Sequence, residues 1–326
     1  MLRLFQNYSP FTVLLLIIAA FVMKFQVLSH PQLPVALPDH ILFASILKFL
    51  NPVFRGAFGY TLFAVFILFT QALYLNYITV KYRLFNRNTY LPAFTYLLLT
   101  SIYPAFNYFS EPLLINWLLL ISLSLMLSFS QTTQPRKQIF NAGFAICLPV
   151  LFQFPTIGFI ILLVLALLLL RSFSLGEWIV AGMGYLTPIY FFVCILFLVD
   201  QLPAVTRMPE IGFSIPRHLA NPVYLTGTLI GLLFLLIMGT YTIQQQIHRL
   251  TIFIKRSWIL IYMYFVVSLV VNLIVVSAVN AEWLILVPSM SFVIINGFLL
   301  EKSKRFSNFT FYFSLLLLIF CQLALK

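Results

Sequence analysis

Residues 136–170 read RKQIFNAGFAICLPVLFQFPTIGFIILLVLALLLL. Two basic residues open this stretch, and two apolar runs follow, at 139–154 and 155–173, which meet at the short break QFPT. An α-helix needs roughly 17–25 apolar residues to cross the hydrocarbon core of a bilayer, so the second run is long enough and the first is near the lower limit. The stretch therefore predicts a hairpin of two membrane-spanning helices that turns at QFPT.

The composition of the whole chain agrees with this interpretation. Of its 326 residues, 62% are hydrophobic and only 8% are charged, and the mean hydropathy is +1.05. Soluble domains carry about 25% charged residues, so this chain has too few charges to cover a water-facing surface. Strands of a β-barrel would give short alternating segments instead of continuous apolar runs. We predict an all-α, polytopic transmembrane bundle in which residues 1–326 form a single integral membrane domain.

Apolar runs recur along the chain and predict about eleven spans. We place them at 9–28, 57–80, 91–108, 112–131, 139–154, 155–173, 177–199, 222–244, 258–278, 283–300 and 309–325. No small-residue cleavage site follows the first run, so it predicts a retained helix and not a cleaved signal peptide. The longest polar interruptions, at about 29–56 and 200–221, are too short to form a domain with its own core.

The basic residues predict the orientation of the spans. If the N-terminus is cytoplasmic, the following residues all fall on the cytoplasmic side: Lys81, Arg83, Arg87, Arg136, Lys137, Arg171, Arg249, Lys255, Arg256, Lys302, Lys304 and Arg305. This is the distribution that the positive-inside rule requires. Five of the seven acids fall on the other side, and Glu177 and Glu301 are the exceptions. We therefore predict a cytoplasmic N-terminus and a periplasmic C-terminus.

Two proline-rich segments, HPQLPVALPDH at 30–40 and DQLPAVTRMPEIGFSIPRHLANP at 200–222, fall on the outer side in this topology. Proline restricts the backbone and removes a hydrogen-bond donor, so both segments predict loops and not further spans. The sequence HILFASILKFL follows the first loop. Its apolar residues Ile41, Leu42, Ile46, Leu47 and Leu50 fall near one helical face, which predicts a short helix lying in the membrane interface.

Several kinds of chemistry have no sequence signal. No phosphate-binding glycine motif, HExxH motif, His/Cys cluster or GxSxG elbow is present. The net charge of +12 follows from the basic turns between spans and does not indicate a nucleic-acid partner. Cys147, Cys194 and Cys321 lie inside apolar runs, where buried small hydrophobic side chains are expected. No ionisable residue lies clearly at mid-membrane, which argues against a proton-coupled transporter or a channel.

The remaining candidate site is a cluster of outer-face charges. Its members are Asp39, His40, Lys48, Arg55, Glu111, Arg207, Glu210, Arg217, His218 and Glu282. A general base is most often a carboxylate or an imidazole, and a guanidinium group binds phosphate bidentately. Asp39 with Arg207 or Arg217 would supply both groups at a membrane surface. The alternative is that these charges only keep the loops in water.

This layout resembles the GT-C class of lipid-dependent glycosyltransferases. The matching stretches are LPDH in the first outer loop, HILFASILKFL as an interface helix, YFSEP on the second outer turn and the paired helices of 136–170. The resemblance implies a polyprenyl-phosphate sugar as donor, with Asp39 activating the acceptor hydroxyl. It also implies that Glu111 supports a divalent metal ion or orients the acceptor. The substrate-binding residues would be Arg207 and Arg217, which hold the lipid phosphate, together with His40 and His218.

The chain departs from the GT-C pattern in three ways. Asp39 lies about ten residues after the first span, its neighbour is His40 and not a second acid, and no large C-terminal outer domain is present. The stretches LNYITVKYRLFNRNTYLPA and RKQIFNAGFA also resemble an uncharacterised family of bacterial multi-pass inner-membrane proteins. That second resemblance implies a location in the bacterial inner (cytoplasmic) membrane and supplies no activity.

Three functions therefore stay open. The first is a glycosyltransferase that uses a lipid-linked sugar at the outer face. The second is a non-enzymatic scaffold or an accessory subunit of an envelope secretion or assembly system, which needs no catalytic acid. The third is a lipid or small-solute permease, which would need a polar cavity reaching past the middle of the bilayer. Convergence of Asp39, Glu111 and an outer arginine around one groove would favour the first function.

Overall fold

The computed structural model describes residues 2–6, 9–34, 41–54, 56–132, 134–201, 222–275, 281–299 and 304–324. Within these ranges the chain is helical and contains no strand. The α-helices are α1 (Leu2–Gln6), α2 (Pro10–Met23), α3 (Phe25–Ser29), α4 (Ile41–Leu50), α5 (Ala57–Lys81), α6 (Leu91–Thr100), α7 (Glu111–Leu127), α8 (Pro135–Cys147), α9 (Ile160–Leu170), α10 (Leu175–Leu198), α11 (Pro222–Gln246), α12 (Ile252–Ile274), α13 (Val287–Phe298) and α14 (Lys304–Ala324). Short 3₁₀ helices join some of them: η1 (Pro104–Asn107), η2 (Leu148–Leu151), η3 (Phe154–Phe159), η5 (Ile247–Arg249) and η6 (Ala281–Leu286).

Each predicted apolar run overlaps at least one of these α-helices. Among the described residues, six helical segments are long and apolar enough to cross a membrane: Ala57–Lys81, Leu175–Leu198, Val223–Arg249, Ile252–Ile274, Ala281–Phe298 and Arg305–Ala324. Shorter apolar helices occupy Pro10–Met23, Ile41–Leu50, Leu91–Thr100, Glu111–Leu127 and Phe154–Leu170. The part of the chain that the structure describes is thus all-helical and has several helices long and apolar enough for a multi-pass membrane protein, as the sequence predicts.

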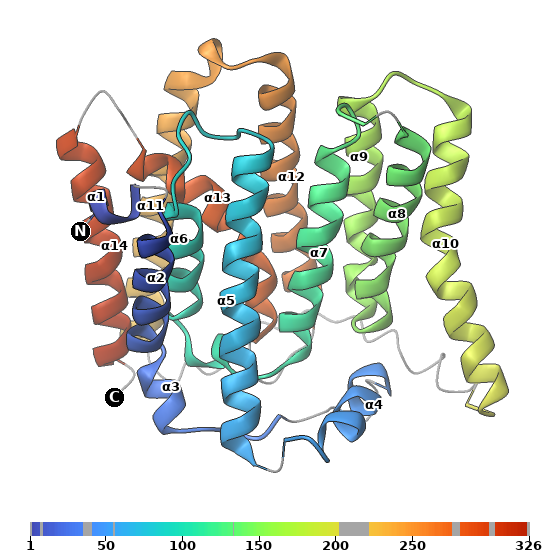
Figure 1. The fold of residues 1–326 in the computed structure, drawn as a ribbon, viewed down its shortest axis with the longest axis horizontal. Coiled ribbons are helices and arrows are strands. Elements are labelled where there is room, and N and C mark those ends of the chain that lie inside the picture. The colour runs from blue at the N-terminus through green and yellow to red at the C-terminus, as the bar shows by residue number, and fades with distance from the viewer. Residues whose placement is uncertain are drawn as a thin grey trace.

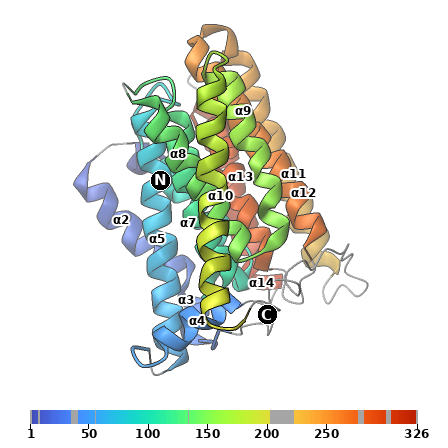
Figure 2. The same ribbon diagram turned by 90° about the vertical axis from the view of Figure 1, so that its right-hand side faces the viewer.

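The long helices stand side by side and form an upright bundle (Figure 1). We call the end at which α5 finishes and α8 begins the upper end, and the end at which α5 begins and α14 finishes the lower end (Figure 1). Helix α4 lies at the lower end, below the helices of the bundle. Helix α10 lies at the edge of the bundle, where it faces the viewer in Figure 2. Its exposed side chains are apolar, as lipid-facing side chains must be.

Prolines shorten several helices toward the lower end. Helix α6 stops four residues before Pro104, which opens η1, and α8 stops two residues before Pro149 in η2. Proline has no backbone N–H and disfavours the α conformation at the residue before it. The chain therefore continues through 3₁₀ turns at these points. The QFPT break falls at the join of η2 and η3, so α8 and α9 lie on either side of it, as the sequence predicts. Neither of them is among the helices long and apolar enough to cross a membrane by themselves, so the spanning hairpin stays a prediction.

Polar side chains in the bundle interior join neighbouring helices. The Tyr96 hydroxyl donates to Gln71 Oε1 at 2.6 Å, and Gln71 Nε2 donates to the Leu113 carbonyl oxygen at 2.7 Å. These bonds connect α6, α5 and α7 among side chains that are fully buried. A buried amide or hydroxyl without a partner would cost roughly 1–3 kcal/mol, so such pairs restrict how the three helices pack.

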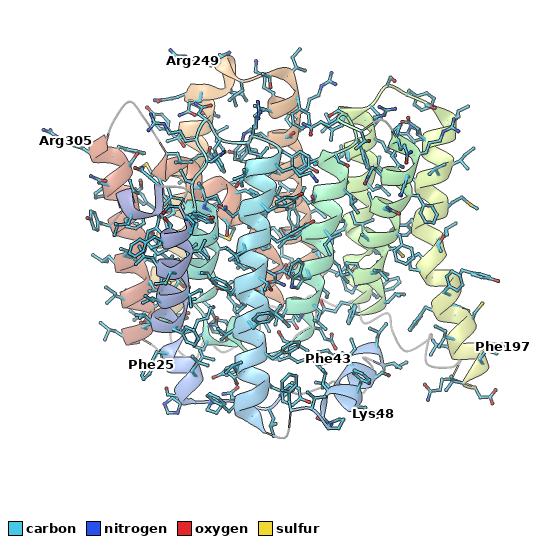
Figure 3. All side chains as sticks on the ribbon, viewed as in Figure 1. Phe25, Phe43, Lys48, Phe197, Arg249 and Arg305 are labelled. Carbon is cyan, nitrogen blue, oxygen red and sulfur yellow. The ribbon has the colours of Figure 1, made fainter. Side chains whose placement is uncertain are left out.

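Charged residues separate between the two ends. Figure 3 shows Arg249 and Arg305 at the upper end and Lys48 at the lower end. The upper end also carries Lys81, Arg83, Arg87, Arg136, Lys137, Arg171, Lys255 and Arg256, whereas the lower end carries Glu111, Asp200 and Glu282. Glu177, an exception to this separation, is paired: Arg171 donates to its two carboxylate oxygens at 3.1 and 2.5 Å. That carboxylate also raises the pKa of Arg171 above its ordinary value.

Glycines let α8 and α10 approach each other closely. A Cβ atom added at Gly143 of α8 would lie 2.7 Å from the Ala181 carbonyl oxygen of α10. A Cβ added at Gly184 of α10 would overlap the Phe140 carbonyl oxygen of α8. Small residues at such crossings allow backbones in a membrane to pack directly against each other.

Gly184→Ala is expected to destabilise the protein because its methyl group would push α10 away from α8. Overpacking of this kind costs about 1–3 kcal/mol. Gly182→Ala is the matched control, since a Cβ at Gly182 meets nothing within 4 Å and alanine favours the helix. Thermal unfolding in detergent should give a lower melting temperature for Gly184→Ala and an unchanged or higher one for Gly182→Ala. Equal melting temperatures would contradict the close crossing.

Candidate functional site

The structure describes part of the predicted site, and the members that it describes lie at the lower end of the bundle. Asp39, His40, Arg207, Arg217 and His218 lie outside the described residues. Glu111 is the first residue of α7 and is buried, with 7% of its surface exposed. A carboxylate at a helix N-terminus is favoured by the helix dipole, which accounts for an acid at this position.

Helix α4 begins directly after His40 and packs close to the start of α7. The Phe43 ring is fully buried and stacks on the Phe109 ring with centroids 5.6 Å apart. Phe109 also contacts Tyr60 of α5, whose hydroxyl donates to Asn51 Oδ1 at 2.7 Å just beyond α4. Because Phe109 lies two residues before Glu111, these contacts bring the helix that follows the Asp39–His40 pair close to Glu111.

The predicted apolar face of α4 is partly correct. Leu47 is buried as expected, whereas Ile41, Leu42, Ile46 and Leu50 are only half-buried. Phe43, which the sequence prediction left out, is the most deeply buried side chain of the helix at 1% exposure. The buried face of α4 is therefore the one that contains Phe43, which contacts Phe109. The spacing of the aliphatic residues alone predicts a buried face that is rotated slightly away from Phe43.

A second acid lies on an element that contacts α7. Asn116 Nδ2 donates to the Leu284 carbonyl oxygen at 2.9 Å, which joins α7 to η6. Glu282 lies two residues earlier in η6, and its buried Oε2 atom has no hydrogen-bond partner among the described residues. Glu111 and Glu282 thus belong to two touching elements at the same end of the bundle. Within the described ranges, no group of three metal-binding side chains is formed.

Lys24 is a buried basic residue that the sequence analysis passed over. It interrupts the first apolar run between α2 and α3 and has no exposed surface. Its Nζ atom donates to Thr100 Oγ1 at 3.0 Å and to Asn107 Oδ1, and both acceptors are uncharged. Asn107 Nδ2 donates in turn to the Thr100 carbonyl oxygen at 3.0 Å. A single lysine inside an apolar run was the signal available in the sequence.

This arrangement holds η1 in place. Lys24 and Thr100 both contact Asn107, the last residue of η1, and four residues later the chain reaches Glu111. Burial of an amine is costly unless its protons are hydrogen-bonded. The hydrogen bonds of Lys24 therefore restrict the positions of the end of α6 and of η1. Lys24 therefore acts as a positioning residue for the segment that carries Glu111.

No protein-family model, no curated protein and no solved structure matches this chain. Its function must therefore be argued from the arrangement at the two ends of the bundle.

Asn107→Leu is expected to lower stability by about 1–3 kcal/mol, because it leaves the Lys24 amine buried with one acceptor fewer. Adding Lys24→Met should restore part of the loss, since an apolar side chain needs no acceptor. The double variant should therefore melt at a higher temperature than Asn107→Leu alone, which thermal unfolding in detergent would measure. If the stability loss of the double variant equals the sum of the losses of Asn107→Leu and Lys24→Met, the two residues do not interact energetically.

Proposed function

We propose that this protein is a glycosyltransferase of the bacterial inner membrane that uses a polyprenyl-phosphate-linked sugar. The observation that supports this proposal is the packing of Phe43 against Phe109. It brings the helix that follows Asp39 and His40 to the segment that leads to Glu111. A proline-flanked acid, an interface helix and a buried carboxylate at one end of an apolar bundle suit a substrate that enters from the lipid phase.

In this mechanism Asp39 accepts the proton of the acceptor hydroxyl. The acceptor oxygen then forms a bond to the anomeric carbon of the sugar, and the bond from that carbon to the phosphate oxygen breaks. The leaving group is polyprenyl phosphate, whose negative charge Arg207 and Arg217 would stabilise through bidentate hydrogen bonds. His40 and His218 would contact the substrate, and Glu111 would orient the acceptor or support a divalent metal ion.

The separation of charges supports the orientation that this mechanism needs. The upper end carries the basic turns, and the positive-inside rule assigns such an end to the cytoplasm. The lower end then faces the periplasm. Together with the alternating direction of successive helices, this gives the proposed arrangement of about eleven spans with a cytoplasmic N-terminus and a periplasmic C-terminus.

Asp39→Asn is expected to reduce sugar transfer by about 10²–10⁴-fold, because an amide cannot accept the proton in the way a carboxylate does. The measurement is transfer of labelled sugar from a polyprenyl-phosphate donor in membranes, together with the glycoconjugate profile of cells that carry only the variant. Glu111→Gln should also reduce transfer.

Asp200→Asn is the matched control for this experiment. Asp200 is an exposed acid just beyond α10 at the same end, and its backbone has a positive φ of 56°, which asparagine also tolerates. Its transfer rate should be that of the unmodified protein. Normal transfer and normal glycoconjugates in Asp39→Asn, at equal expression, would contradict the proposal.

Sidedness gives an independent test of the same proposal. In a variant whose three native cysteines are replaced by serine or alanine, Asp39→Cys should react with a membrane-impermeant thiol reagent added to intact spheroplasts. Arg249→Cys should react only after the membrane is opened, because Arg249 is exposed at the basic end. Protection of position 39 and labelling of position 249 in intact spheroplasts would reverse the orientation and remove the proposed role of Asp39.

A further inference from the structure

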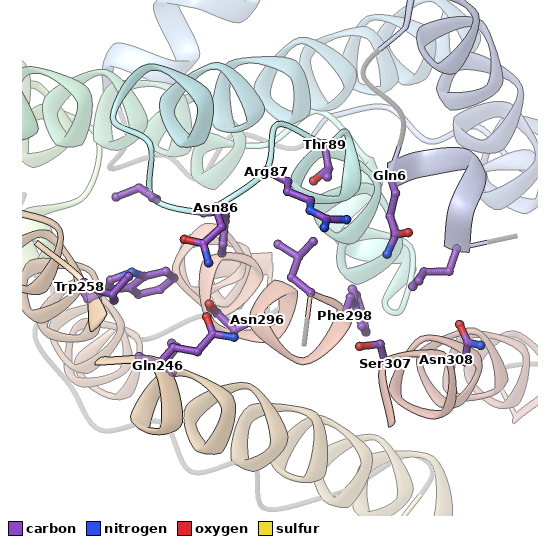
Figure 4. A pocket seen from close by; sticks show the side chains of 16 residues that line it. Gln6, Asn86, Arg87, Thr89, Gln246, Trp258, Asn296, Phe298, Ser307 and Asn308 are labelled. Carbon is purple, nitrogen blue, oxygen red and sulfur yellow. The ribbon is translucent and has the colours of Figure 1, made fainter. Parts of the chain in front are cut away.

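A pocket of about 270 Å³ opens at the upper end of the bundle, opposite the proposed transfer site. Its walls come from segments far apart in the sequence: α1, the loop of residues 84–89, the end of α11, the start of α12, the end of α13 and the start of α14. Figure 4 shows polar side chains from these segments facing a common space, with Arg87, Thr89 and Gln6 along one side. The volume equals that of about nine water molecules.

The loop that covers the pocket is held in a defined conformation. Helix α5 ends in a Schellman motif, in which Arg83 has a φ of 49° and Leu84 N donates to the Thr79 carbonyl oxygen at 3.1 Å. Leu84 is buried after the turn. This turn reverses the chain and directs residues 85–89 across the end of the bundle.

Helix α1 is fixed beside this loop. Tyr90 N donates to the Phe5 carbonyl oxygen at 3.0 Å, and the Phe5 ring packs on the Phe94 ring with centroids 4.5 Å apart. The next residue, Gln6, is therefore held at the pocket wall. On another side, Phe85 contacts the buried Trp258 ring edge to face at 5.7 Å. The pocket is thus built by packed side chains and backbone hydrogen bonds.

The lining has the chemistry of an anion site. Among the sixteen described residues that line it, Arg87 alone carries a formal charge, and no carboxylate is included. Thr89 is 2% exposed, and its Oγ1 atom has no hydrogen-bond partner among the described residues. A buried hydroxyl without a partner is unfavourable, so a ligand oxygen beside Arg87 would satisfy it. Asn86, Gln246 and Trp258 offer amide hydrogen bonds and an aromatic wall for the rest of a ligand.

The charged residues around the pocket also favour a negatively charged ligand. Basic residues gather at this end, and Arg249 and Arg305 project from it in Figure 3. A concentration of positive charge attracts anions and raises their local concentration. Glutamine, asparagine and threonine side chains both donate and accept hydrogen bonds, as a ligand with several hydroxyl groups requires.

We infer that this pocket binds a phosphorylated, hydroxyl-rich molecule, with the phosphate beside Arg87 and Thr89 and the hydroxylated part against Asn86, Gln246 and Trp258. The phosphate comes from a soluble sugar phosphate or from the headgroup of an anionic lipid, and both present the same oxygens to Arg87. The site is separate from the proposed transfer site, so it stands whether or not the protein transfers sugars.

The test uses the purified full chain in phosphatidylcholine nanodiscs. The first arm titrates glucose 6-phosphate, inorganic phosphate and glucose, and follows thermal stability and tryptophan fluorescence. The second arm replaces part of the phosphatidylcholine by phosphatidylglycerol without a soluble ligand. We expect glucose 6-phosphate to stabilise the protein more than inorganic phosphate does, and glucose alone to have little effect. Stabilisation only in the second arm would identify a lipid headgroup as the source of the phosphate.

Variants separate this site from general attraction to the basic end. Arg87→Gln should weaken binding at least about 10-fold, because it removes a charged hydrogen-bond donor, and Arg87→Lys should recover part of the loss. Thr89→Val should weaken binding several-fold while preserving the shape of the side chain. Arg249→Gln removes the same charge at the same end but outside the lining, and should leave affinity within about twofold.

Three results would overturn the inference. They are absence of stabilisation in both arms, unchanged binding in Thr89→Val, and an equal loss of binding in Arg249→Gln and Arg87→Gln. An altered melting profile without ligand would reveal that Arg87→Gln fails to fold. In that case the ligand affinity of Thr89→Val, compared with that of Arg249→Gln, tests the inference.

Discussion

The structure depends on one requirement: backbone N–H and C=O groups in an apolar medium must be hydrogen-bonded within the protein. A helix meets this requirement locally, which is why the described chain is helical throughout its apolar runs. The requirement relaxes toward the ends of the bundle. There proline removes donors, and the chain continues through 3₁₀ turns such as η1 and η2. Irregular backbone is therefore concentrated at the two ends of the bundle. The polar side chains that could bind a ligand or take part in a reaction are concentrated there too.

The same requirement applies to polar side chains in the interior. The Tyr96 and Gln71 bonds connect three helices, and Lys24 connects the α2–α3 break to α6 and η1. Each group is buried, so removing its partner leaves an unsatisfied donor or acceptor. These contacts give the bundle a specific packing that apolar surfaces alone would not select, because lipid tails are as apolar as the helix faces. In this way the interior polar groups fix the positions of both ends.

The two ends differ in chemistry. The lower end gathers Glu111, Glu282 and the aromatic contact between Phe43 of α4 and Phe109, whereas the upper end gathers basic turns and a pocket lined by amides, hydroxyls and Arg87. The lower end thus presents carboxylates and the upper end presents basic and hydrogen-bonding groups, so the two ends offer different chemistry to a ligand. Glu177 lies at the upper end, but its negative charge is neutralised there because its carboxylate forms an ion pair with Arg171.

Local features of the sequence were sufficient to predict an all-helical chain with several long apolar helices and a helix on each side of the QFPT break. Among the described residues six helices are long and apolar enough to cross a membrane, whereas the sequence predicted about eleven spans. Hydropathy and proline placement act over short stretches, so they can be read without knowing which helices touch. The sequence also predicted a helix after the first outer loop, but it missed Phe43 as the anchor of that helix. The identity of the contacting ring, Phe109, is not a property of α4 itself.

Only the tertiary structure decided which distant residues meet. Lys24 reaches acceptors 76 and 83 residues away, and Asn116 reaches a carbonyl oxygen 168 residues away. The pocket at the upper end draws on α1 and α14, from opposite ends of the chain. Apolar runs fix where helices form but carry no information on their order around the bundle, since any apolar face packs against any other. That order is set by glycine crossings and buried polar pairs, whose partners become visible only once the chain is folded.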